Sequence, residues 1–474
     1  MCLVYSLNSL VHSLIFVVLL IDSTKKDAPM HRIAVIGSGI SGLAAARRLA
    51  GAPGQHGVTL LEAGSHFGGH ANTVDMTLGG VSQGVDTGFL VFNHRTYPLL
   101  TRLFEELQVP TAAAEMSFSV QVPNANGQAG LEWSGSSLGG VFAQRGNLLR
   151  PRFLKMLAEI LRFNRLATRI AKEGDETQLR SSIKGFLDEH HFGAAFRQDY
   201  LLPMMGCIWS CPTDQMLRFP VATLIRFCHN HGLIQVTDRP QWHTVRGGSR
   251  QYVRRMVAAL QQDGRHDARL NTPVLGLRRV AHGVLLQMAH GTEQFDAVVL
   301  ACHSDQALRL LGSDATPQER SVLGAIRYQP NQAVLHTDAS VLPRREVAWA
   351  AWNYERAADS GREQAGVCLH YLLNRLQPLP WTKPVMVSLN PVRPIDDSQV
   401  HARMEYSHPV FDLAAIEAQS QVGALQGQRR TWFCGAWCGY GFHEDGLRSG
   451  LEVADKLLNA LPALALSSTF EGAA

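Results

Sequence analysis

Cysteine is scarce in this sequence, which excludes a disulfide framework. Eight cysteines occur in 474 residues, too few for the dense cross-linking of a small secreted domain, so we expect a reducing compartment. Two pairs, Cys207 with Cys211 and Cys434 with Cys438, are spaced at the loose end of zinc-binding patterns. Because another motif explains the second pair better, the sequence predicts no metal site.

Charge is also sparse, and neither sign dominates. Charged residues make up 18% of the chain and the formal net charge is +4, which is too weak a basic balance to indicate nucleic acid binding. Lysine is rare between residues 60 and 430, where only Lys155, Lys172, Lys184 and Lys383 occur. The hydrophobic fraction of 46% predicts instead a large core, enough for two domains with little disorder.

The chain begins with an apolar run, Leu3–Ile21, that lacks the features of a secretory signal. It has no basic n-region and no small-x-small cleavage site, and polar residues such as Ser9 and His12 interrupt it. One interpretation makes residues 1–29 a membrane anchor, with the following domain on the cytoplasmic side. The interpretation we favour places the true start at Met30, directly before the first predicted strand, in a cytoplasmic protein.

Three glycines near the start of the chain form a motif typical of nucleotide-binding folds. The stretch Ile33–Leu49 predicts a buried strand, a tight turn and a helix, and its turn carries Gly37, Gly39 and Gly42 in the spacing G-x-G-x-x-G. The first glycine permits the turn, the second lets a phosphate approach the backbone, and the third lets helix and strand pack closely. The free N–H groups of the helix N-terminus would face a bound pyrophosphate.

An acidic residue stands where this motif requires one. Val58–Glu62 predicts the second strand of a βαβ unit, and Glu62 follows Gly42 by 20 residues. A carboxylate at this distance accepts hydrogen bonds from both ribose hydroxyls. The strands, glycines, helix and acid together predict a bound dinucleotide.

Two further loops point to a particular family. Glu62-Ala-Gly is followed by Gly68-Gly69 and then by Asp86-Thr-Gly88, inside a stretch, Val81–Asn93, that alternates like a strand. This order resembles the flavin-containing amine oxidoreductases. In that family the Gly-Gly loop closes over the FAD pyrophosphate and is followed by Arg. His70 stands there in this sequence, which weakens a charge contact but leaves the backbone donors.

A second glycine-rich segment near the end of the chain favours FAD over NAD. Thr431–Ala454 predicts a strand, the small pair Gly435-Ala436, a glycine-rich turn and a helix from about Gly446, whose N-terminus would face the pyrimidine edge of a flavin. The resemblance implies that residues from all of these segments, together with Val274 on the adenine side, contact FAD. They are Gly37, Gly39, Ile40, Ser41, Gly42, Glu62, Ala63, Gly69, His70, Thr87, Gly88, Val274, Gly435, Ala436, Asp445, Gly446 and Leu447.

The segments between these motifs are apolar and aromatic enough to wall a substrate cavity. The richest are residues 201–212 and 227–234 and the tryptophan-containing stretch 310–425. His229 and His231 lie in the second segment at a spacing that does not suit one helix face, and we expect them to be structural.

Two amphipathic helices are predicted, over residues 96–108 and 151–173. The second carries Arg162, Arg165 and Arg169 opposite its apolar stripe, followed by Lys172. These cations predict a solvated face, with peripheral contact to an anionic membrane surface as the alternative.

The predicted fold class is therefore α/β, with a Rossmann-like FAD-binding domain that is discontinuous in sequence and an interleaved α+β substrate domain. The expected FAD-binding segments are 30–100, 240–310 and 426–460; the expected substrate-domain segments are 101–239 and 311–425; residues 461–474 are expected to be a C-terminal tail.

Longer motifs narrow the resemblance. Val85–Pro98, Phe142–Pro151, Leu217–Pro220, Asp238–Trp242 and Gly441–Ser449 are similar to NAD(P)/FAD-binding amine-oxidase-like proteins that resemble the oxidoreductase domain joined to some cyclopropane-fatty-acid synthases. This resemblance implies an FAD-dependent oxidoreductase that removes a hydride from an apolar, lipid-linked substrate such as an acyl chain. It also implies a lipid methyltransferase as a partner.

Two other functions stay open. A flavin amine oxidase would act on a small amine and often uses a lysine that holds a water at the flavin; none of the rare lysines lies in a glycine-rich flavin motif. A flavin-bound accessory protein would tether a methyltransferase without redox chemistry. His443, Glu444 and His94 are the candidates for steering a proton near neutral pH, although many flavin dehydrogenations need no dedicated base.

Overall fold

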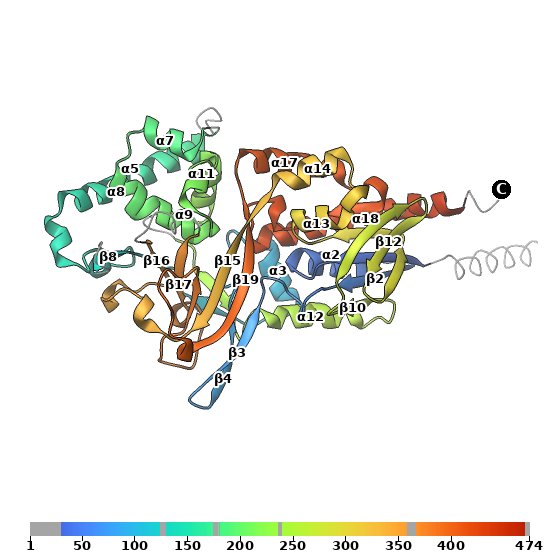
Figure 1. Ribbon diagram of the computed structural model, residues 1–474, viewed down its shortest axis with the longest axis horizontal. Helices are drawn as coiled ribbons and strands as arrows, with labels where there is room; N and C mark the ends of the chain where they lie inside the picture. The colour runs from blue at the N-terminus through green and yellow to red at the C-terminus, as the bar shows by residue number, and fades with distance from the viewer. Residues whose placement is uncertain are drawn as a thin grey trace, which may run out of the picture.

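The computed structural model describes residues 30–123, 129–173, 179, 181–235, 239–357 and 366–469. Residues 1–29, for which the sequence left open a membrane anchor or a start at Met30, lie outside this described part. The molecule is elongated, with the strands of the glycine motif toward one end and a helical layer over a larger sheet toward the other (Figure 1). Among the described residues, no helix combines the length and the apolar character that crossing a bilayer requires.

A five-stranded parallel sheet carries the glycine motif. Its strand order is β10-β2-β1-β14-β20, and every neighbouring pair is parallel. The predicted βαβ unit is confirmed, because Ile33 of β1 pairs with Val58 of β2. The strands are β1 (His31–Ile36), β2 (His56–Leu61), β10 (Asp267–Arg269), β14 (Ala297–Leu300) and β20 (Thr431–Phe433).

Side chains that alternate along these strands pack into two hydrophobic clusters, one on each face of the sheet. Ile33 and Val35 of β1 pack into one cluster, whereas Ala34 and Ile36 join another, as expected for a strand buried on both faces. The first face is covered by α2 (Ile40–Ala50), α12 (Arg250–Gln261) and α18 (His443–Thr469). The second is covered by β11 (Val274–Val280), β12 (Gly283–Met288), β13 (Gly291–Phe295), α13 (Ser304–Leu311), α14 (Pro317–Ala325) and α17 (Leu413–Leu425).

A seven-stranded sheet forms the second half of the molecule. Its order is β19-β15-β18-β17-β16-β7-β8, antiparallel except for the β16–β7 pair. The strands are β7 (Phe118–Pro123), β8 (Ala129–Ser134), β15 (Arg327–His336), β16 (Trp352–Glu355), β17 (Cys368–Leu372), β18 (Met386–Leu389) and β19 (Val400–Val410).

Helices from the middle of the chain gather at the end of this second half that lies far from the C-terminus (Figure 1). The longest, α5 (Pro151–Glu173), has the bounds that its periodicity predicts. The others are α4 (Leu138–Val141), the 3₁₀ turn η1 (Arg145–Leu149), α7 (Ile183–Glu189), α8 (Ala194–Phe196), the π-helical turn η2 (Arg197–Leu201), α9 (Leu202–Trp209), α10 (Thr213–Met216) and α11 (Val221–Asn230).

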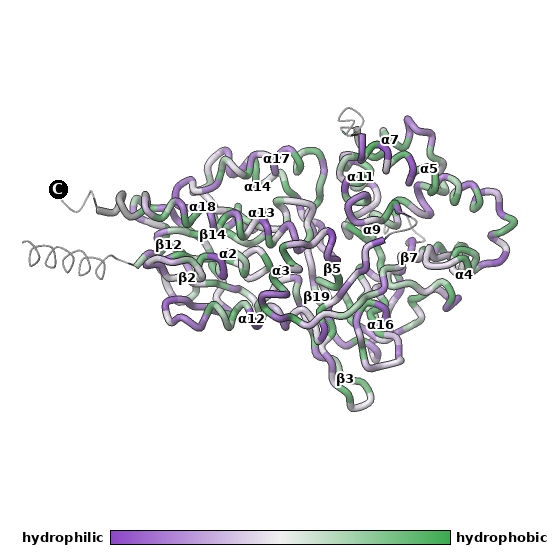
Figure 2. The backbone as a smooth tube through the Cα atoms, turned by 180° about the vertical axis from the view of Figure 1, so that it is seen from behind, coloured by the Kyte–Doolittle hydropathy of each residue, from purple (hydrophilic) through white to green (hydrophobic). Residues whose placement is uncertain are grey.

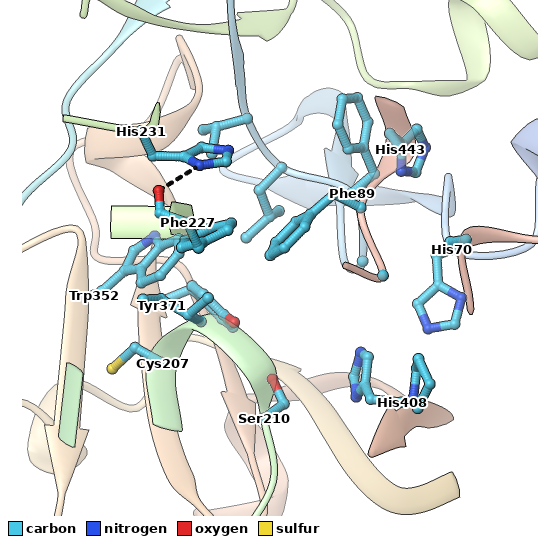
Figure 3. A pocket seen from close by; sticks show the side chains of 18 of the residues that line it. His70, Phe89, Cys207, Ser210, Phe227, His231, Trp352, Tyr371, His408 and His443 are labelled. Carbon is cyan, nitrogen blue, oxygen red and sulfur yellow. Dashed lines mark hydrogen bonds between the residues drawn. The ribbon is translucent and has the colours of Figure 1, made fainter. Parts of the chain in front are cut away.

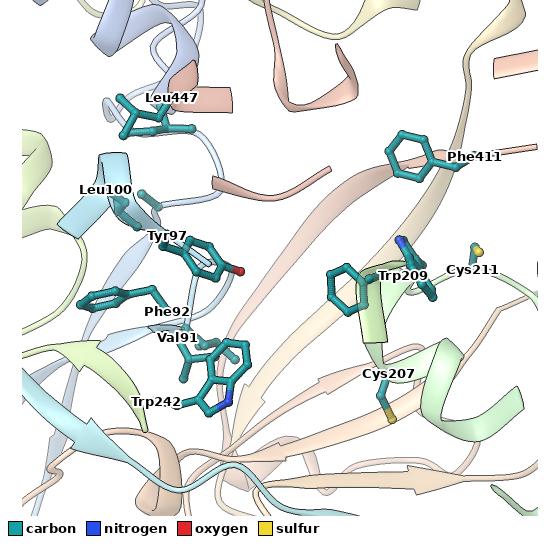
Figure 4. Close-up of a cluster of buried hydrophobic side chains, with 14 of the residues drawn as sticks. Val91, Phe92, Tyr97, Leu100, Cys207, Trp209, Cys211, Trp242, Phe411 and Leu447 are labelled. Atoms are coloured by element: carbon teal, nitrogen blue, oxygen red, sulfur yellow. The ribbon is translucent and has the colours of Figure 1, made fainter. Parts of the chain in front are cut away.

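Short elements join the two halves. β5 (Phe92–Asn93), β9 (Trp242–Val245) and β6 (Thr111–Ala114) form a small sheet, and α3 (Pro98–Glu106) packs against α18. Figure 2 shows α3 and β5 in the middle of the molecule, with the hairpin of β3 (Thr73–Leu78) and β4 (Val81–Asp86) projecting below. In Figure 4, Phe92, Tyr97 and Leu100 from this junction lie on one side of a hydrophobic cluster, and Trp209 of α9 lies on the other side.

Three predicted elements differ from the structure. The strand expected over Val81–Asn93 is interrupted between β4 and β5, because Thr87 N–H bonds to Asn72 and Phe89 N–H bonds to the His70 carbonyl at 2.7 Å. Helix α18 begins at His443, before Gly446. It also continues to Thr469 through most of the expected C-terminal tail; residues 470–474 lie outside the described part.

Candidate active site

The turn between β1 and α2 uses its three glycines in three different ways. Gly37 has φ +101°, and a Cβ there would lie 2.8 Å from the Ala301 carbonyl oxygen. A Cβ on Gly42 would lie 1.9 Å from the Gly37 carbonyl oxygen, so this glycine lets helix and turn touch. A Cβ on Gly39 would meet no protein atom within 4 Å, and Gly39 lines a large cavity. Gly39 is thus the position where a ligand can approach the backbone.

Glu62 lies beside this turn, directly after β2. Its carboxylate accepts hydrogen bonds from the backbone N–H of Ser38 at 3.0 Å and of Gly64 at 2.8 Å, and also from the Ser38 hydroxyl. These contacts hold the carboxylate at the wall of the cavity, which Glu62 and Ala63 line. The arrangement presents an acceptor at the carboxyl edge of the parallel sheet, where such folds bind ribose.

The second glycine loop lies opposite the first. A Cβ on Gly69 would lie 3.2 Å from the Cα of Gly39, and Gly68 N–H donates to the Ser38 carbonyl at 3.1 Å. Two backbone loops without side chains between them form a cradle that any Cβ would fill. Such a cradle fits a pyrophosphate, because backbone N–H groups can approach the phosphate oxygens.

His70, which stands where the resembling family has an arginine, is half-buried at the edge of this cradle. Its ring stacks on Tyr406 at 4.9 Å and lies 5.2 Å from the ring of His408 and 6.4 Å from that of His303. Burial, with smaller contributions from His408 and His303, holds the pKa of His70 well below its ordinary value. The ring is therefore neutral near pH 7, and its Nε2 is buried without a hydrogen-bond partner, which leaves a polar atom available to a ligand.

The third predicted segment completes the wall. Gly435 and Ala436 line the cavity, and a Cβ on Gly446 would lie 2.8 Å from Cγ2 of Ile40. The Asp445 carboxylate accepts hydrogen bonds from Tyr440 N–H at 3.0 Å and from Phe442 N–H at 3.1 Å. These contacts shape the turn into α18, and burial raises the pKa of Asp445 to about 6.

The predicted cofactor residues divide into two groups. Some line the cavity: Gly37, Gly39, Ile40, Ser41, Glu62, Ala63, Gly69, His70, Gly88, Val274, Gly435 and Ala436. The others lie behind this wall and support it: Gly42, Thr87, Asp445, Gly446 and Leu447. Thr87, for example, hydrogen bonds through its hydroxyl to Tyr406 at 2.8 Å.

The three candidates for proton steering have different surroundings. His443 lines the cavity, stacks on Phe89 at 3.7 Å (Figure 3) and lies 3.0 Å from the Tyr252 hydroxyl. Burial lowers the pKa of His443 to about 3, so it stays neutral near pH 7 and does not act as a titrating group there. This corrects the expectation from its ordinary pKa.

Glu444 and His94 do not face the cavity. The buried Glu444 carboxylate accepts hydrogen bonds from the N–H groups of Leu99 at 2.9 Å and of Leu100 at 3.0 Å, which caps α3. His94 is exposed and packs against His243 at 4.4 Å. Their proximity in sequence to flavin motifs was misleading, because the Glu444 carboxylate binds the start of α3 and His94 packs on His243 at the surface.

The cavity extends well beyond the two glycine loops. It has a volume of about 1600 Å³. In Figure 3, His70 and His408 lie on one side and Trp352, Tyr371 and Cys207 on the other. The predicted apolar segments do contribute to its wall, through Met204, Cys207, Ile208, Phe227, His231, Trp352 and Tyr371.

His231 belongs to this wall as an aromatic group. Its ring stacks on Phe227 at 3.9 Å, and its Nδ1 hydrogen bonds to the Phe227 carbonyl. Burial lowers the pKa of His231 to about 4. Phe89, Leu90 and Trp242 also line the cavity and were not predicted to do so. The position of Phe89 directly after Asp86-Thr-Gly88 was the sequence feature that could have indicated its place in the wall.

The four cysteines of the two predicted pairs do not form a metal-binding group in the described part of the chain. There, the side chains placed closely enough to share an ion are Glu355, Cys368 and His370. The His370 imidazole Nε2 lies 3.0 Å from the Glu355 carboxylate, whose other oxygen is 2.8 Å from Arg393 Nε. The Glu355 carboxylate is thus already paired with both His370 and Arg393.

Comparison with known proteins agrees with this geometry. The family model described as flavin containing amine oxidoreductase matches residues 40–346, so the chain belongs to that family. Its cofactor is FAD, and the protein is an FAD-dependent oxidoreductase; bound FAD accepts the electrons removed from a substrate. No curated protein sequence matches the chain.

Solved structures share the fold at low sequence identity. A conjugated-linoleic-acid-producing fatty acid isomerase from P. acnes has 16% identity and a TM-score of 0.62, with 90% of this chain and 98% of that chain covered. Cyclohexylamine oxidase from Brevibacterium oxydans IH-35A also has 16% identity and a TM-score of 0.62, with coverages of 92% and 100%. Reduced UDP-galactopyranose mutase has 12% identity and a TM-score of 0.60, with coverages of 91% and 94%.

Proposed function

We propose that this FAD-dependent oxidoreductase removes a hydride from the acyl chain of a lipid. The observation that carries the proposal is the apolar extension of the cavity beyond the two glycine loops. It is walled by Phe142, Leu157 and Ile160 from the α4–α5 region and by Met204 and Ile208 of α9. A total volume of about 1600 Å³ exceeds the roughly 300–1,000 Å³ of an ordinary ligand pocket, which leaves room for a cofactor and a long apolar substrate together.

Several polar groups that line the cavity are paired or uncharged, whereas Asn164 Oδ1 and Trp352 Nε1 are buried without a hydrogen-bond partner. Glu115 lines the cavity, and its carboxylate is paired with Arg375 at 2.7 Å. His443 and His231 are neutral near pH 7 because burial lowers the pKa of each. In this environment the protein's part is to exclude water and to align a chain of methylene groups, while the hydride acceptor is the cofactor.

Anaerobic mixing tests the proposal. We expect phospholipids that carry unsaturated, cyclopropane or methyl-branched acyl chains to bleach the flavin absorbance of the holoenzyme in a stopped-flow experiment, whereas the matching headgroup without acyl chains should not. If no acyl lipid reduces the flavin and the protein co-purifies with a lipid methyltransferase, the accessory role is supported instead.

A variant that narrows the apolar extension should slow the reaction of long acyl chains without weakening the binding of FAD. Ile160 lines the cavity from α5, outside the glycine loops. We expect Ile160→Trp to retain FAD and to lower the second-order rate of flavin reduction by long acyl chains about tenfold or more, since a larger ring fills space that a chain would occupy. Short-chain lipids should lose less than threefold; equal losses for short and long chains would contradict this assignment.

A small-amine oxidase is the second candidate, because cyclohexylamine oxidase shares the fold and because Trp352 and Tyr371 line the cavity with their rings 5.6 Å apart, edge to face. Such rings can surround an amine. No lysine lines the cavity in the described part of the chain, which speaks against a lysine-held water. A hydrogen peroxide assay on an amine panel distinguishes the two, since peroxide production without lipid-dependent bleaching would favour the amine.

A further inference from the structure

Large apolar side chains are exposed together on α4, η1 and α5. Leu149 is 87% exposed and Leu138 is 80% exposed, although burying such side chains is favourable. We call this set the leucine face; its members are Leu138, Leu148, Leu149, Leu154 and Leu161. The elements that carry it lie at the end of the molecule opposite the C-terminus (Figure 2).

The same elements are strongly basic. Between Leu138 and Lys172 the one acidic residue is Glu159, which is 7% exposed and accepts a hydrogen bond from Gly193 N–H at 3.1 Å. It therefore offers little negative charge to the outside. The basic residues of this stretch are Arg145, Arg150, Arg152, Lys155, Arg162, Arg165, Arg169 and Lys172, all exposed.

Helix α5 carries exposed leucines and basic residues along one side. Leu154, Leu161, Arg165 and Lys172 recur at spacings of seven, four and seven residues, so they share one outward side of the helix. The N-terminal half of this side is apolar and the C-terminal half is basic. Apolar groups beside lysine and arginine are typical of helices that lie in the interface of an anionic membrane.

The leucine face also borders the large cavity. Leu138 and Leu161 are exposed and at the same time line the cavity, together with Leu157 and Ile160 of the same region. A second hollow of about 570 Å³ adjoins it at Leu161 and Asn164. Its other walls are Arg165, Thr168, Arg169, Lys172, Glu173 and Ile234, so three cations outweigh one carboxylate.

We propose that the leucine face docks on an anionic phospholipid bilayer, with Arg165, Arg169 and Lys172 against the lipid phosphates. The acyl chain then enters the cavity beside Leu161 without crossing water. This entry route rests on the proposed function, whereas the docking surface rests on the exposed leucines and the charge alone. An anionic bilayer is the occupant that complements both the apolar and the basic half of the face.

Vesicle co-sedimentation of the holoenzyme tests the docking. Vesicles made of equal parts phosphatidylcholine and phosphatidylglycerol should bind the protein. Pure phosphatidylcholine vesicles should bind it at least about tenfold more weakly, because each cation near an anionic surface strengthens binding by roughly fivefold. Binding should also fall with added NaCl.

Matched variants locate the surface. Arg165→Glu with Arg169→Glu, and separately Leu149→Ser with Leu154→Ser, should each weaken vesicle binding about tenfold or more. Arg278→Glu and Leu413→Ser are the controls, since both side chains are exposed on β11 and α17, outside this face; they should bind like the parent. Flavin absorbance and thermal melting report that every variant is folded.

The docking surface is refuted if the parent binds neutral and anionic vesicles equally, if it binds neither, or if the face variants bind no worse than the controls. Vesicle binding without bleaching by any lipid refutes the proposed function and leaves the surface. Bleaching by detergent-dispersed lipid without vesicle binding refutes the surface alone.

Discussion

Gly42→Ala is expected to lower the free energy of unfolding by about 3 kcal/mol, the upper part of the range for forcing a methyl group into a packed interior. The added Cβ would lie 1.9 Å from the Gly37 carbonyl oxygen and 3.1 Å from the Ala301 Cβ. Neither neighbour is the end of a flexible side chain, so helix α2 must move away from the turn. Thermal and denaturant unfolding of the FAD-free protein measure the loss.

Gly39→Ala is the matched control in the same motif, three residues before Gly42, because the Gly39 backbone conformation is one that alanine also adopts. Gly39 has φ −60° and ψ 174°, which alanine adopts without strain, and its Cβ would meet no protein atom within 4 Å. We expect the FAD-free variant to melt like the parent and to bind FAD at least about tenfold more weakly, because the methyl group enters the space for the pyrophosphate.

The contrast between the two variants is the decisive result. A stable Gly42→Ala protein would show that α2 does not need its contact with the turn. A Gly39→Ala protein that binds FAD as tightly as the parent would show that the pyrophosphate does not pass close to Gly39. Fluorescence of the released flavin and a titration of the FAD-free protein give the affinity.

Asp86→Ala is expected to have the second large effect, a loss of about 4 kcal/mol or more in unfolding free energy. The buried carboxylate accepts hydrogen bonds from Ser249 N–H at 2.8 Å, the Thr73 hydroxyl at 2.6 Å and the Gln377 amide at 2.8 Å. Alanine would leave these donors buried without an acceptor, each at a cost of about 1–3 kcal/mol. Because two of the donors, Ser249 and Gln377, come from segments far from Asp86 in the chain, the packing of these segments against the β3–β4 hairpin should loosen together.

Asp75→Ala is the control for this variant. Asp75 lies in β3, is 67% exposed at its side chain and pairs with Arg250, the residue after Ser249. An exposed pair of this kind contributes about 1 kcal/mol or less, so the variant should melt close to the parent. An Asp86→Ala protein as stable as Asp75→Ala would contradict the role assigned to Asp86.

The advantage of the parent over Asp86→Ala should also depend on pH. Burial raises the pKa of Asp86 to about 6, whereas an unfolded aspartate titrates near 4. Between these values the folded state keeps a proton that the unfolded state has lost, so this contribution to stability is complete below about pH 4 and is lost as the pH rises through 6. Unfolding of both proteins from pH 4 to 7 measures the difference.

Local spacing predicted the cofactor-binding part of the fold well. Gly37, Gly39 and Gly42, with Glu62 after the second strand, indicate a βαβ unit because the positive φ of Gly37 and the contact between Gly42 and Gly37 both arise within one turn. Helix α5 has its predicted bounds because its apolar period runs over six turns. In both cases the relevant contacts are close in sequence.

The chemistry of individual side chains was predicted less well. His443 was expected to titrate near neutral pH, but its ring is enclosed by Phe89 and Tyr252, and burial lowers its pKa to about 3. His94 was expected near the flavin and is exposed instead. A residue's position after a motif does not determine the direction of its side chain.

The sequence by itself therefore determined the dinucleotide cradle and, through the family resemblance, FAD, since strand, turn and helix signals are local. Only the tertiary structure decided which side chains enclose the cavity, that Asp86 joins Thr73, Ser249 and Gln377, and that the leucine face borders the cavity. The physical reason is that burial, pKa and cavity shape depend on contacts between segments that lie far apart in the chain, such as Asp86 with Ser249 and Gln377.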